Sequence, residues 1–188
     1  PCFGMVGTRH PSLMAKYRLE RLFLGLKRLV TVSGGALGID SMIHDFSLIH
    51  DLPTVAVLAS GLDTMTPRSN QALFDRIMRC QRSCILSECP PGVVPKPYFF
   101  PQRNRLIAAL SSKLLVVEAA RRSGAVLTAN LAAQMAVDVA AMVGAFNSPQ
   151  SEGCYQLMND GAYVVGGVDA LASFLDDMMD VQQTIPFS

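Results

Sequence analysis

The stretch VTVSGGALGID, residues 30–40, predicts a β-strand that passes through a glycine-rich turn into a helix. Its β-branched start favours a strand, which we expect over 29–32, and a helix is expected over 38–50. The glycines allow a tight turn and let a ligand approach bare backbone amides, while the helix start favours an anion. A strand that feeds a helix in this way is the repeating unit of a parallel sheet.

The same strand-to-helix rhythm continues along the whole chain. Further strands are predicted over 3–6, 54–58, 83–87, 113–118, 138–143 and 163–165, and further helices over 12–27, 70–81, 102–110, 126–135, 153–159 and 168–179. The strands are apolar runs, as expected when helices cover both faces of a sheet. The pattern therefore predicts an α/β fold, a doubly wound, mostly parallel sheet of about seven or more strands. We expect a domain over 1–175 and a tail or linker over 176–188.

The composition indicates one folded domain. Of 188 residues, 50% are hydrophobic and 16% are charged, which excludes disorder, and no apolar run is long enough for a membrane helix. The start lacks a signal peptide, so we expect a cytoplasmic protein, and it also lacks Met, so we expect a fragment. The five cysteines are irregularly spaced and form no CxxC, which predicts reduced thiols and neither a disulfide framework nor a metal site.

Charge is distributed unevenly along the chain. Residues 1–122 hold all sixteen Lys and Arg against eight Asp and Glu, a net charge of +8, whereas residues 123–188 hold seven acidic residues and no cation. Such asymmetry favours a basic face that binds phosphates, with an ordinary solvated surface as the alternative.

Polar loops follow the predicted strands, and in a doubly wound sheet the ligand crevice lies outside the carboxyl ends of the strands. In the first loop, Gly7–Ser12, the backbone amides and Ser12 are expected to hold one oxyanion while the forked guanidinium of Arg9 binds another. The alternative is a pair between Arg9 and a carboxylate such as Asp63. In the second loop, Ser33–Gly38 is interpreted as a phosphate cradle or as a plain tight turn, because it matches neither GxGxxG nor the Walker pattern.

The segment PKPYFFPQRNR, residues 95–105, is the most informative loop. It combines three cations, three consecutive aromatic residues and Asn104, and its prolines restrict the backbone. A cationic groove with aromatic faces is typical of proteins that bind single-stranded nucleic acid. Asn104 is expected either to read a base edge or to hold the loop, and Phe100 faces either the ligand or the rim. Arg121 and Arg122 either extend the basic face or are simply solvated.

Six stretches, in this order, resemble the DNA-processing protein A family, also called DprA or Smf. They are GTRHPS (7–12), SGGALGID (33–40), SGLDTMTPRSN (60–70), SECPPGVVPKPYFFPQRNRLIAALS (87–111), VVEAARRSGAVLTA (116–129) and SEGCYQLMNDGA (151–162). Together they cover nearly the whole chain, and FPQRNRLIA with its PPG prefix is highly specific.

The resemblance implies an extended Rossmann-like domain that forms a homodimer and binds single-stranded DNA without a small cofactor. It further implies that the protein protects incoming strands during natural transformation and helps to load RecA. Arg9 and Lys96 match cations of a basic pocket for the DNA backbone. Other matched positions belong to the phosphate-contacting turn (Ser33, Gly34, Gly38) and to the FPxRNR motif (Phe100, Arg103, Asn104, Arg105).

The chain departs from the family pattern at three places. It has Thr66-Pro67 where the family usually has Tyr-Pro, Ala136-Val137 near a usual Gly-Arg, and Met142-Val143-Gly144 in place of Val-Pro-Gly. These changes affect expectations about edge strands and dimer geometry more than those about the DNA site.

An enzyme is the alternative, because related folds include nucleoside-monophosphate phosphoribohydrolases and other nucleotide-binding proteins. Their PGGxGTxxE motif is absent, and Glu118 precedes Ser123-Gly124 instead of following a glycine-threonine turn. No catalytic triad or cofactor fingerprint is present, so we expect a binding protein without catalytic residues.

Overall fold

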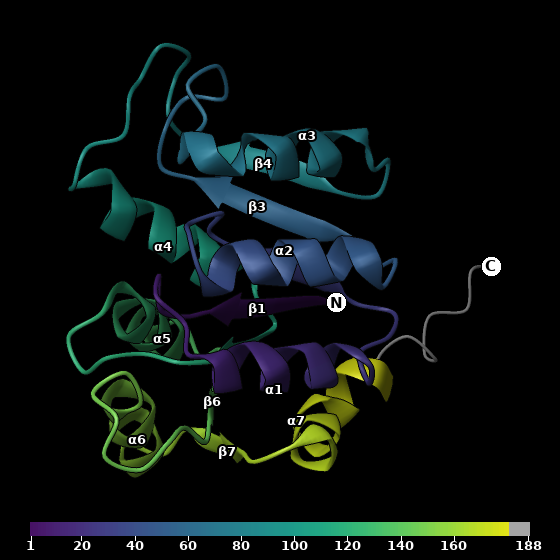
Figure 1. Cartoon of the computed structure of the whole chain (residues 1–188), viewed down its shortest axis with the longest axis vertical. Coiled ribbons are helices and arrows are strands. Elements are labelled where there is room, and N and C mark those ends of the chain that lie inside the picture. The colour runs from purple at the N-terminus through teal and green to yellow at the C-terminus, as the bar shows by residue number, and fades with distance from the viewer. Residues whose placement is uncertain (181–188) are drawn as a thin grey trace.

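The computed structural model describes residues 1–180, and in this range seven strands alternate with seven α-helices (Figure 1). The strands are β1 (Cys2–Val6), β2 (Val30–Ser33), β3 (Thr54–Leu58), β4 (Cys84–Ser87), β5 (Lys113–Val116), β6 (Asp138–Met142) and β7 (Tyr163–Val165). The helices are α1 (Leu13–Phe23), α2 (Ile39–Ile49), α3 (Gln71–Arg79), α4 (Phe99–Leu110), α5 (Gly124–Gln134), α6 (Glu152–Asn159) and α7 (Val168–Asp180), with a 3₁₀ turn, η1 (Arg68–Asn70), before α3. None of these helices is long and apolar enough to cross a membrane.

All seven strands are parallel and lie in the order β4-β3-β2-β1-β5-β6-β7, which confirms the predicted doubly wound α/β sheet. The chain starts in the centre at β1, builds outward to β4, and then crosses back to place β5 on the other side of β1. The loops after β1 and β5 therefore diverge from each other. This is the topological switch point, where open α/β sheets bind their ligands.

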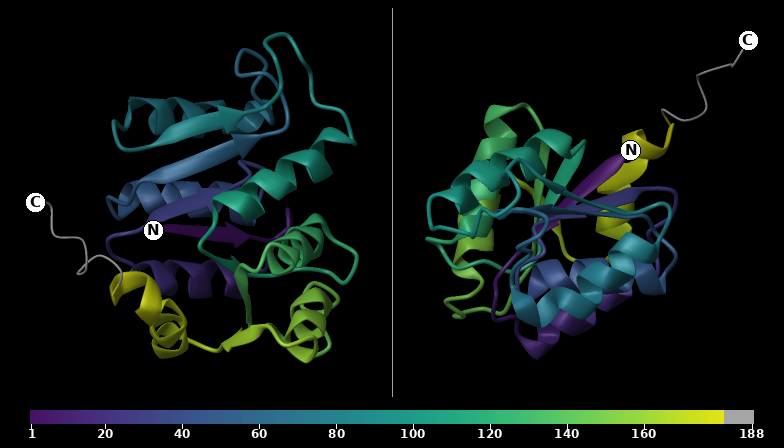
Figure 2. Two further views of the ribbon diagram at one scale, coloured as in Figure 1. Left: turned by 180° about the vertical axis from the view of Figure 1, so that it is seen from behind. Right: turned by 90° about the horizontal axis from the view of Figure 1, so that it is seen from above.

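Helices cover both faces of the sheet. One face carries α1, α2, α3 and α7, and the other carries α4, α5 and α6, as the views in Figure 2 show. Successive side chains of a strand point to opposite faces, so Phe3 and Met5 of β1 join the core beneath α1 while Val6 joins the core beneath α5.

The helix boundaries agree with the predicted ones to within two residues, except at the end of α1 and the start of α4. Helix α1 ends at Phe23, before Gly25, and not at Lys27. Helix α4 begins at Phe99 rather than Gln102, because a helix tolerates proline in its first turn, where an N–H would have no intrahelical partner. Helix α7 runs past residue 175, where the domain is predicted to end, and buries Met178; residues 181–188 of the predicted tail lie outside the described range.

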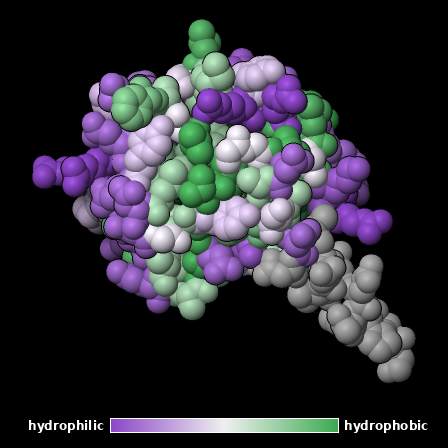
Figure 3. All heavy atoms as spheres, turned by 90° about the horizontal axis from the view of Figure 1, so that it is seen from below, coloured by the Kyte–Doolittle hydropathy of each residue, from purple (hydrophilic) through white to green (hydrophobic). Residues whose placement is uncertain are grey.

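Strand β7 forms one lateral edge of the sheet and, within residues 1–180, pairs only with β6. Tyr163 and Val164 on this strand are 42% and 49% exposed. Figure 3 looks onto the molecule from this side and shows apolar side chains in the middle of a face with a polar surround.

Candidate nucleic-acid interface

A hollow of about 320 Å³ lies at the switch point, over the carboxyl ends of β1 and β5. We call it the first hollow. Its lining comes from the loops after β1, β2 and β5 and from α4 and α5, and includes Thr8, Arg9, Ala36, Asp40, Phe100, Arg103, Asn104, Ser123, Gly124 and Thr128. The structure thus brings together residues from four of the stretches singled out in the sequence, at 7–12, 33–40, 87–111 and 116–129.

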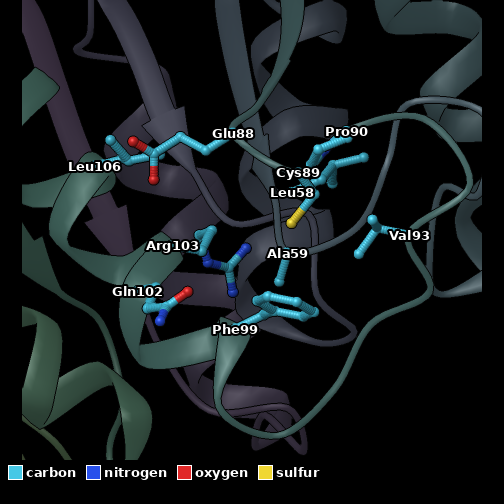
Figure 4. Close-up of a pocket in the computed structure, with 10 residues that line it drawn as sticks. All are labelled: Leu58, Ala59, Glu88, Cys89, Pro90, Val93, Phe99, Gln102, Arg103 and Leu106. Carbon is cyan, nitrogen blue, oxygen red and sulfur yellow. The ribbon is translucent and has the colours of Figure 1, made fainter.

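Two smaller hollows lie at the same rim. The second hollow, about 190 Å³, is lined by Arg9, Gly34, Leu37, Pro67, Phe100 and neighbouring residues. The third hollow, about 120 Å³, lies between the ends of β3 and β4 and the start of α4. Figure 4 shows the Arg103 guanidinium and the Cys89 sulfur directed toward the middle of the third hollow, with the Phe99 ring beside Arg103. Arg103 lines all three hollows.

Arg9 and Phe100 form the boundary between the first and second hollows. The guanidinium carbon of Arg9 lies 5.2 Å from the centre of the half-buried Phe100 ring, and Arg9 itself is exposed. The alternative pair between Arg9 and Asp63 is wrong, because both carboxylate oxygens of Asp63 accept from the backbone N–H of Gly92 at 2.8 Å. Arg9 therefore presents its charge to solvent at the rim of both hollows.

Arg103 differs from Arg9 in being buried, with 7% of its surface exposed. Its Nη1 donates to the carbonyl oxygens of Gly34 and Val57, the latter at 2.6 Å, and its Nε donates to Asn104 Oδ1 at 3.1 Å. These bonds join the start of α4 to the ends of β2 and β3. The Nε and Nη1 donors of Arg103, which were expected to contact DNA, are thus used inside the protein.

Asp40 lies beside Arg103 and is also buried. Burial raises the pKa of the Asp40 carboxyl, while the charge of Arg103 acts in the opposite direction. Burial likewise lowers the pKa of Arg103, and Asp40 opposes that change. The two groups are thus buried neighbours of opposite charge in the floor of the first hollow.

The last two residues of the FPxRNR motif also bond within the protein. Asn104 is buried and its Nδ2 donates to the carbonyl of Gly124 at 3.3 Å, so of its two predicted roles the geometry favours holding the loop. Arg105 is exposed and its Nη2 lies 2.6 Å from both carboxylate oxygens of Glu88. Arg105 is not among the residues that line the three hollows.

The glycine turn after β2 serves close packing. Ser33 is buried and donates to the carbonyl of Met5 at 2.7 Å, so its hydroxyl faces the interior. A Cβ at Gly34 would come within 2.6 Å of an Asp40 carboxylate oxygen. Gly38 has φ of +78°, and a Cβ there would lie 2.6 Å from the Arg9 carbonyl. The tight-turn interpretation therefore accounts for Ser33 and Gly38, and of the three residues predicted to contact phosphate Gly34 is the one that lines a hollow.

The start of α1 already binds an anion, the side chain of Glu118. Ser12 caps the helix by accepting from the N–H of Ala15 at 3.0 Å. The Ser12 N–H and hydroxyl donate to the two carboxylate oxygens of Glu118, each at 2.8 Å. The oxyanion site predicted at Ser12 is thus filled by the protein's own carboxylate, which sequence reasoning did not anticipate.

Lys96 lies in the long loop between β4 and α4, at the top left of Figure 1, and is exposed. The N–H of Phe99 donates to the Lys96 carbonyl at 2.9 Å, which closes a turn just before α4. Two further cations at this rim, Arg121 and Arg122, are exposed after β5.

Arg68 is a cation that the sequence reasoning passed over. It is exposed and directly follows Pro67, which lines the second hollow. Its position in the SGLDTMTPRSN motif, one residue after a proline at the end of a strand loop, was the available signal.

The comparisons with known proteins agree with this architecture. The family model of DNA recombination-mediator protein A matches residues 1–176. DNA processing protein DprA of Streptococcus pneumoniae is 39% identical over 176 residues, which are 93% of this chain and 62% of that protein. Protein Smf of Escherichia coli is 39% identical over 165 residues, 86% of this chain and 44% of that protein. The chain thus spans less than two thirds of the length of these relatives.

Solved structures show the same fold. The structure of the S. pneumoniae DprA superposes with a TM-score of 0.83 at 34% identity, over 100% of this chain and 62% of that one. A DNA processing protein A from Helicobacter pylori, described for its single-stranded DNA binding mode, also gives 0.83, at 27% identity over 96% of this chain and 80% of that one. The molybdenum cofactor carrier protein of Chlamydomonas reinhardtii, at 14% identity and 0.63, shares the fold alone. The chain therefore belongs to the DNA recombination-mediator protein A family, as the motifs of its rim loops indicated.

Proposed function

We propose that the protein binds single-stranded DNA across the hollows at the carboxyl ends of β1–β4. The observation that carries the proposal is the separation of charges at this rim. The cations Arg9, Lys96 and Arg68 are exposed, whereas the neighbouring carboxylates Asp40 and Glu118 are buried and bonded within the protein. Two rim carboxylates are accessible, Asp63 and Glu88, and Glu88 is paired with Arg105. The exposed cations outnumber them, so the rim presents net positive charge to solvent, which attracts a polyanion.

A single strand suits this rim better than a duplex. Single strands are bound by a cationic groove together with aromatic faces on which bases stack, and Tyr98, Phe99 and Phe100 supply such faces beside the cations. The family model and the binding mode described for the H. pylori relative support this choice. Of the residues predicted to contact DNA, we keep Arg9, Lys96, Phe100 and Gly34 and add Arg68, while Ser12, Ser33, Gly38, Arg103, Asn104 and Arg105 are proposed to shape the rim.

The wider role is also a proposal, because the chain spans only part of its relatives. We infer that the protein protects incoming DNA and helps to load RecA in natural transformation and recombination, as the family resemblance implies. Such a role places it in the cytoplasm, where the five free cysteines stay reduced.

We further propose a homodimer that forms through the β7 edge. An edge strand offers unpaired backbone groups, and exposed Tyr163 and Val164 add apolar surface that a second copy would cover. The face in Figure 3 is thus a self-complementary candidate.

Binding without catalysis is the function that we favour. Asp40 is the acidic residue that lines the first hollow, and its charge is offset by that of the neighbouring Arg103. Glu118 is held by Ser12. Release of ribose 5-phosphate from AMP by the purified protein would contradict this proposal and favour the phosphoribohydrolase alternative.

Titration of fluorescent oligo-dT tests the binding site directly. Binding should weaken steeply with salt, because phosphate contacts release counterions. Arg9→Ala and Lys96→Ala should each weaken binding about ten- to hundredfold at low salt, and should flatten the log–log salt slope by about 0.7 per lost phosphate contact.

Lys27→Ala is the matched control, since Lys27 is an exposed cation between α1 and β2, at the amino ends of the strands and opposite the proposed site. It removes the same charge and should leave both affinity and slope nearly unchanged. Equal affinities in all variants would refute the site, and absence of binding by the wild type at low salt would refute the function.

A further inference from the structure

The turn before α4 displays one aromatic ring to solvent. The hydrogen bond from Phe99 N–H to the Lys96 carbonyl, at 2.9 Å, closes the turn and leaves Tyr98 at its corner. Tyr98 is 54% exposed, although it lies within a few residues of the rim hollows. An aromatic ring held open in this way exposes apolar surface without covering any core.

The ring of Tyr98 is supported from inside the protein. Its centre lies 4.4 Å from that of Phe99, with the two planes tilted by 54°. Phe99 lines the third hollow and is half-buried, so it anchors Tyr98 to the start of α4. The Lys96 ammonium lies 6.0 Å from the Tyr98 ring centre, which places a positive charge beside the aromatic face.

Phe100 is less available than Tyr98 for stacking. It is half-buried, and the guanidinium carbons of Arg9 and Arg103 lie 5.2 and 6.0 Å from its ring centre. A base would have to displace these cations to cover the ring. At Tyr98 the neighbouring cation is the end of a flexible lysine, which can move aside without cost to the core.

We propose that Tyr98 is a stacking platform for one nucleobase of the bound strand, with Lys96 neutralising the phosphate next to it. The proposal rests on the proposed function and extends the site from the Arg9–Phe100 boundary onto the β4–α4 loop. Base stacking on an aromatic ring is independent of sequence, because every base offers a π-face.

A tryptophan placed at this position reports on stacking. The chain contains no Trp, so Tyr98→Trp introduces a single tryptophan, whose emission can be followed by itself. Oligo-dT should quench its emission, whereas an abasic oligomer of equal length, with the same phosphates and no bases, should leave most of the emission. Tyr98→Ala should weaken binding of oligo-dT roughly five- to hundredfold, and Tyr98→Phe should restore it.

Tyr17 provides a matched control. It is also 54% exposed and has the Arg21 guanidinium carbon 5.8 Å from its ring, but it lies on α1, on the opposite face of the sheet from α4. Tyr17→Ala should not change the affinity for oligo-dT, and the emission of Tyr17→Trp should not respond to it.

The possible outcomes separate the two proposals. If the wild type does not bind oligo-dT, the proposed function fails. If the wild type binds, but Tyr98→Ala binds equally well and Tyr98→Trp is not quenched, the stacking platform is refuted while the function stands. If Tyr98→Ala weakens binding of the abasic oligomer as much as binding of oligo-dT, the ring acts through the shape of the loop, which also refutes stacking.

Discussion

Arg9 and Arg103 both hold their guanidinium groups near the ring of Phe100, but solvent reaches them very differently. Arg9 is exposed, so its charge is available to a ligand. Arg103 is buried and bonded to two backbone carbonyls beside Asp40. A buried guanidinium that donates to backbone carbonyls is costly to remove, because its loss leaves buried acceptors unsatisfied. The same residue type thus serves recognition at one position and rim geometry at the other.

The substitution Arg103→Met measures the second role. It removes the donors to the carbonyls of Gly34 and Val57 and leaves these buried acceptors unsatisfied. At about 1.5–3 kcal/mol for each bond to a charged group, we expect the free energy of unfolding to fall by about 3–5 kcal/mol. Urea denaturation followed by circular dichroism gives this quantity. Arg105→Met is the control, since the exposed pair with Glu88 should contribute only about 0–1 kcal/mol. A loss at Arg103 no larger than that at Arg105 would show that the buried guanidinium does not stabilise the rim.

At the residue scale, the sequence contained a signal for this burial. Arg103 and Asn104 precede Ile107 and Ala108 by four residues each, which puts all four on one helix face, and these are the buried residues of α4. Arg105 lies off that face and is exposed. Ser12 carried no comparable signal, because its carboxylate partner Glu118 lies 106 residues away in the chain. Contacts of that kind depend on the order of strands, which local pattern does not encode.

At the element scale, periodicity predicted every strand and helix, and the errors lie at the ends of elements. The β4–α4 connection is the instructive case, since the proline-rich pattern predicts a loop as far as Pro101, whereas Phe99–Pro101 form the first turn of α4. Phe100 therefore lies in the first turn of a helix and not in a loop.

A second feature of the elements is a buried polar cluster that joins α2 to β2 and β3, in which the Thr54 hydroxyl contacts Thr31 Oγ1 and His44 Nδ1, each at 2.7 Å.

The His44 contact makes the packing of α2 on the sheet sensitive to acid. Burial lowers the pKa of His44 from 6.5 to about 3, so the unfolded chain takes up this proton at a higher pH than the folded protein. The stabilisation is therefore complete above pH 6.5 and is lost as the pH falls toward 3, by about 1.4 kcal/mol per unit. Urea denaturation at pH 6.5 and pH 5 should show a loss of about 2 kcal/mol that His44→Asn lacks. His10 and His50 remain in both proteins, and parallel pH profiles would contradict the assignment.

At the scale of the whole molecule, the uneven charge of the sequence becomes a spatial division. The cationic residues 1–122 build β1–β5, and the acidic remainder builds β6, β7 and the helices α5–α7. The sheet therefore has a basic side, where the loops of β1–β4 meet at the proposed DNA site, and an acidic side that ends at the β7 edge. A dimer through that edge would keep both DNA sites away from the contact and would let one long strand engage both.

Val164→Glu tests this arrangement, because it places a charge on the exposed edge strand. Light scattering after size-exclusion chromatography should show a dimer for the wild type and a monomer for the variant. Affinity for a short oligo-dT that fills one site should be unchanged, whereas affinity for an oligomer long enough to reach both sites should fall about a hundredfold, since the second contact is no longer intramolecular.

Ile49→Glu, at an aliphatic residue that is 60% exposed at the end of α2, adds the same charge elsewhere and should remain dimeric. A monomeric wild type, or a dimeric Val164→Glu, would exclude the β7 edge as the interface, and equal losses for short and long oligomers would show that the two sites act independently.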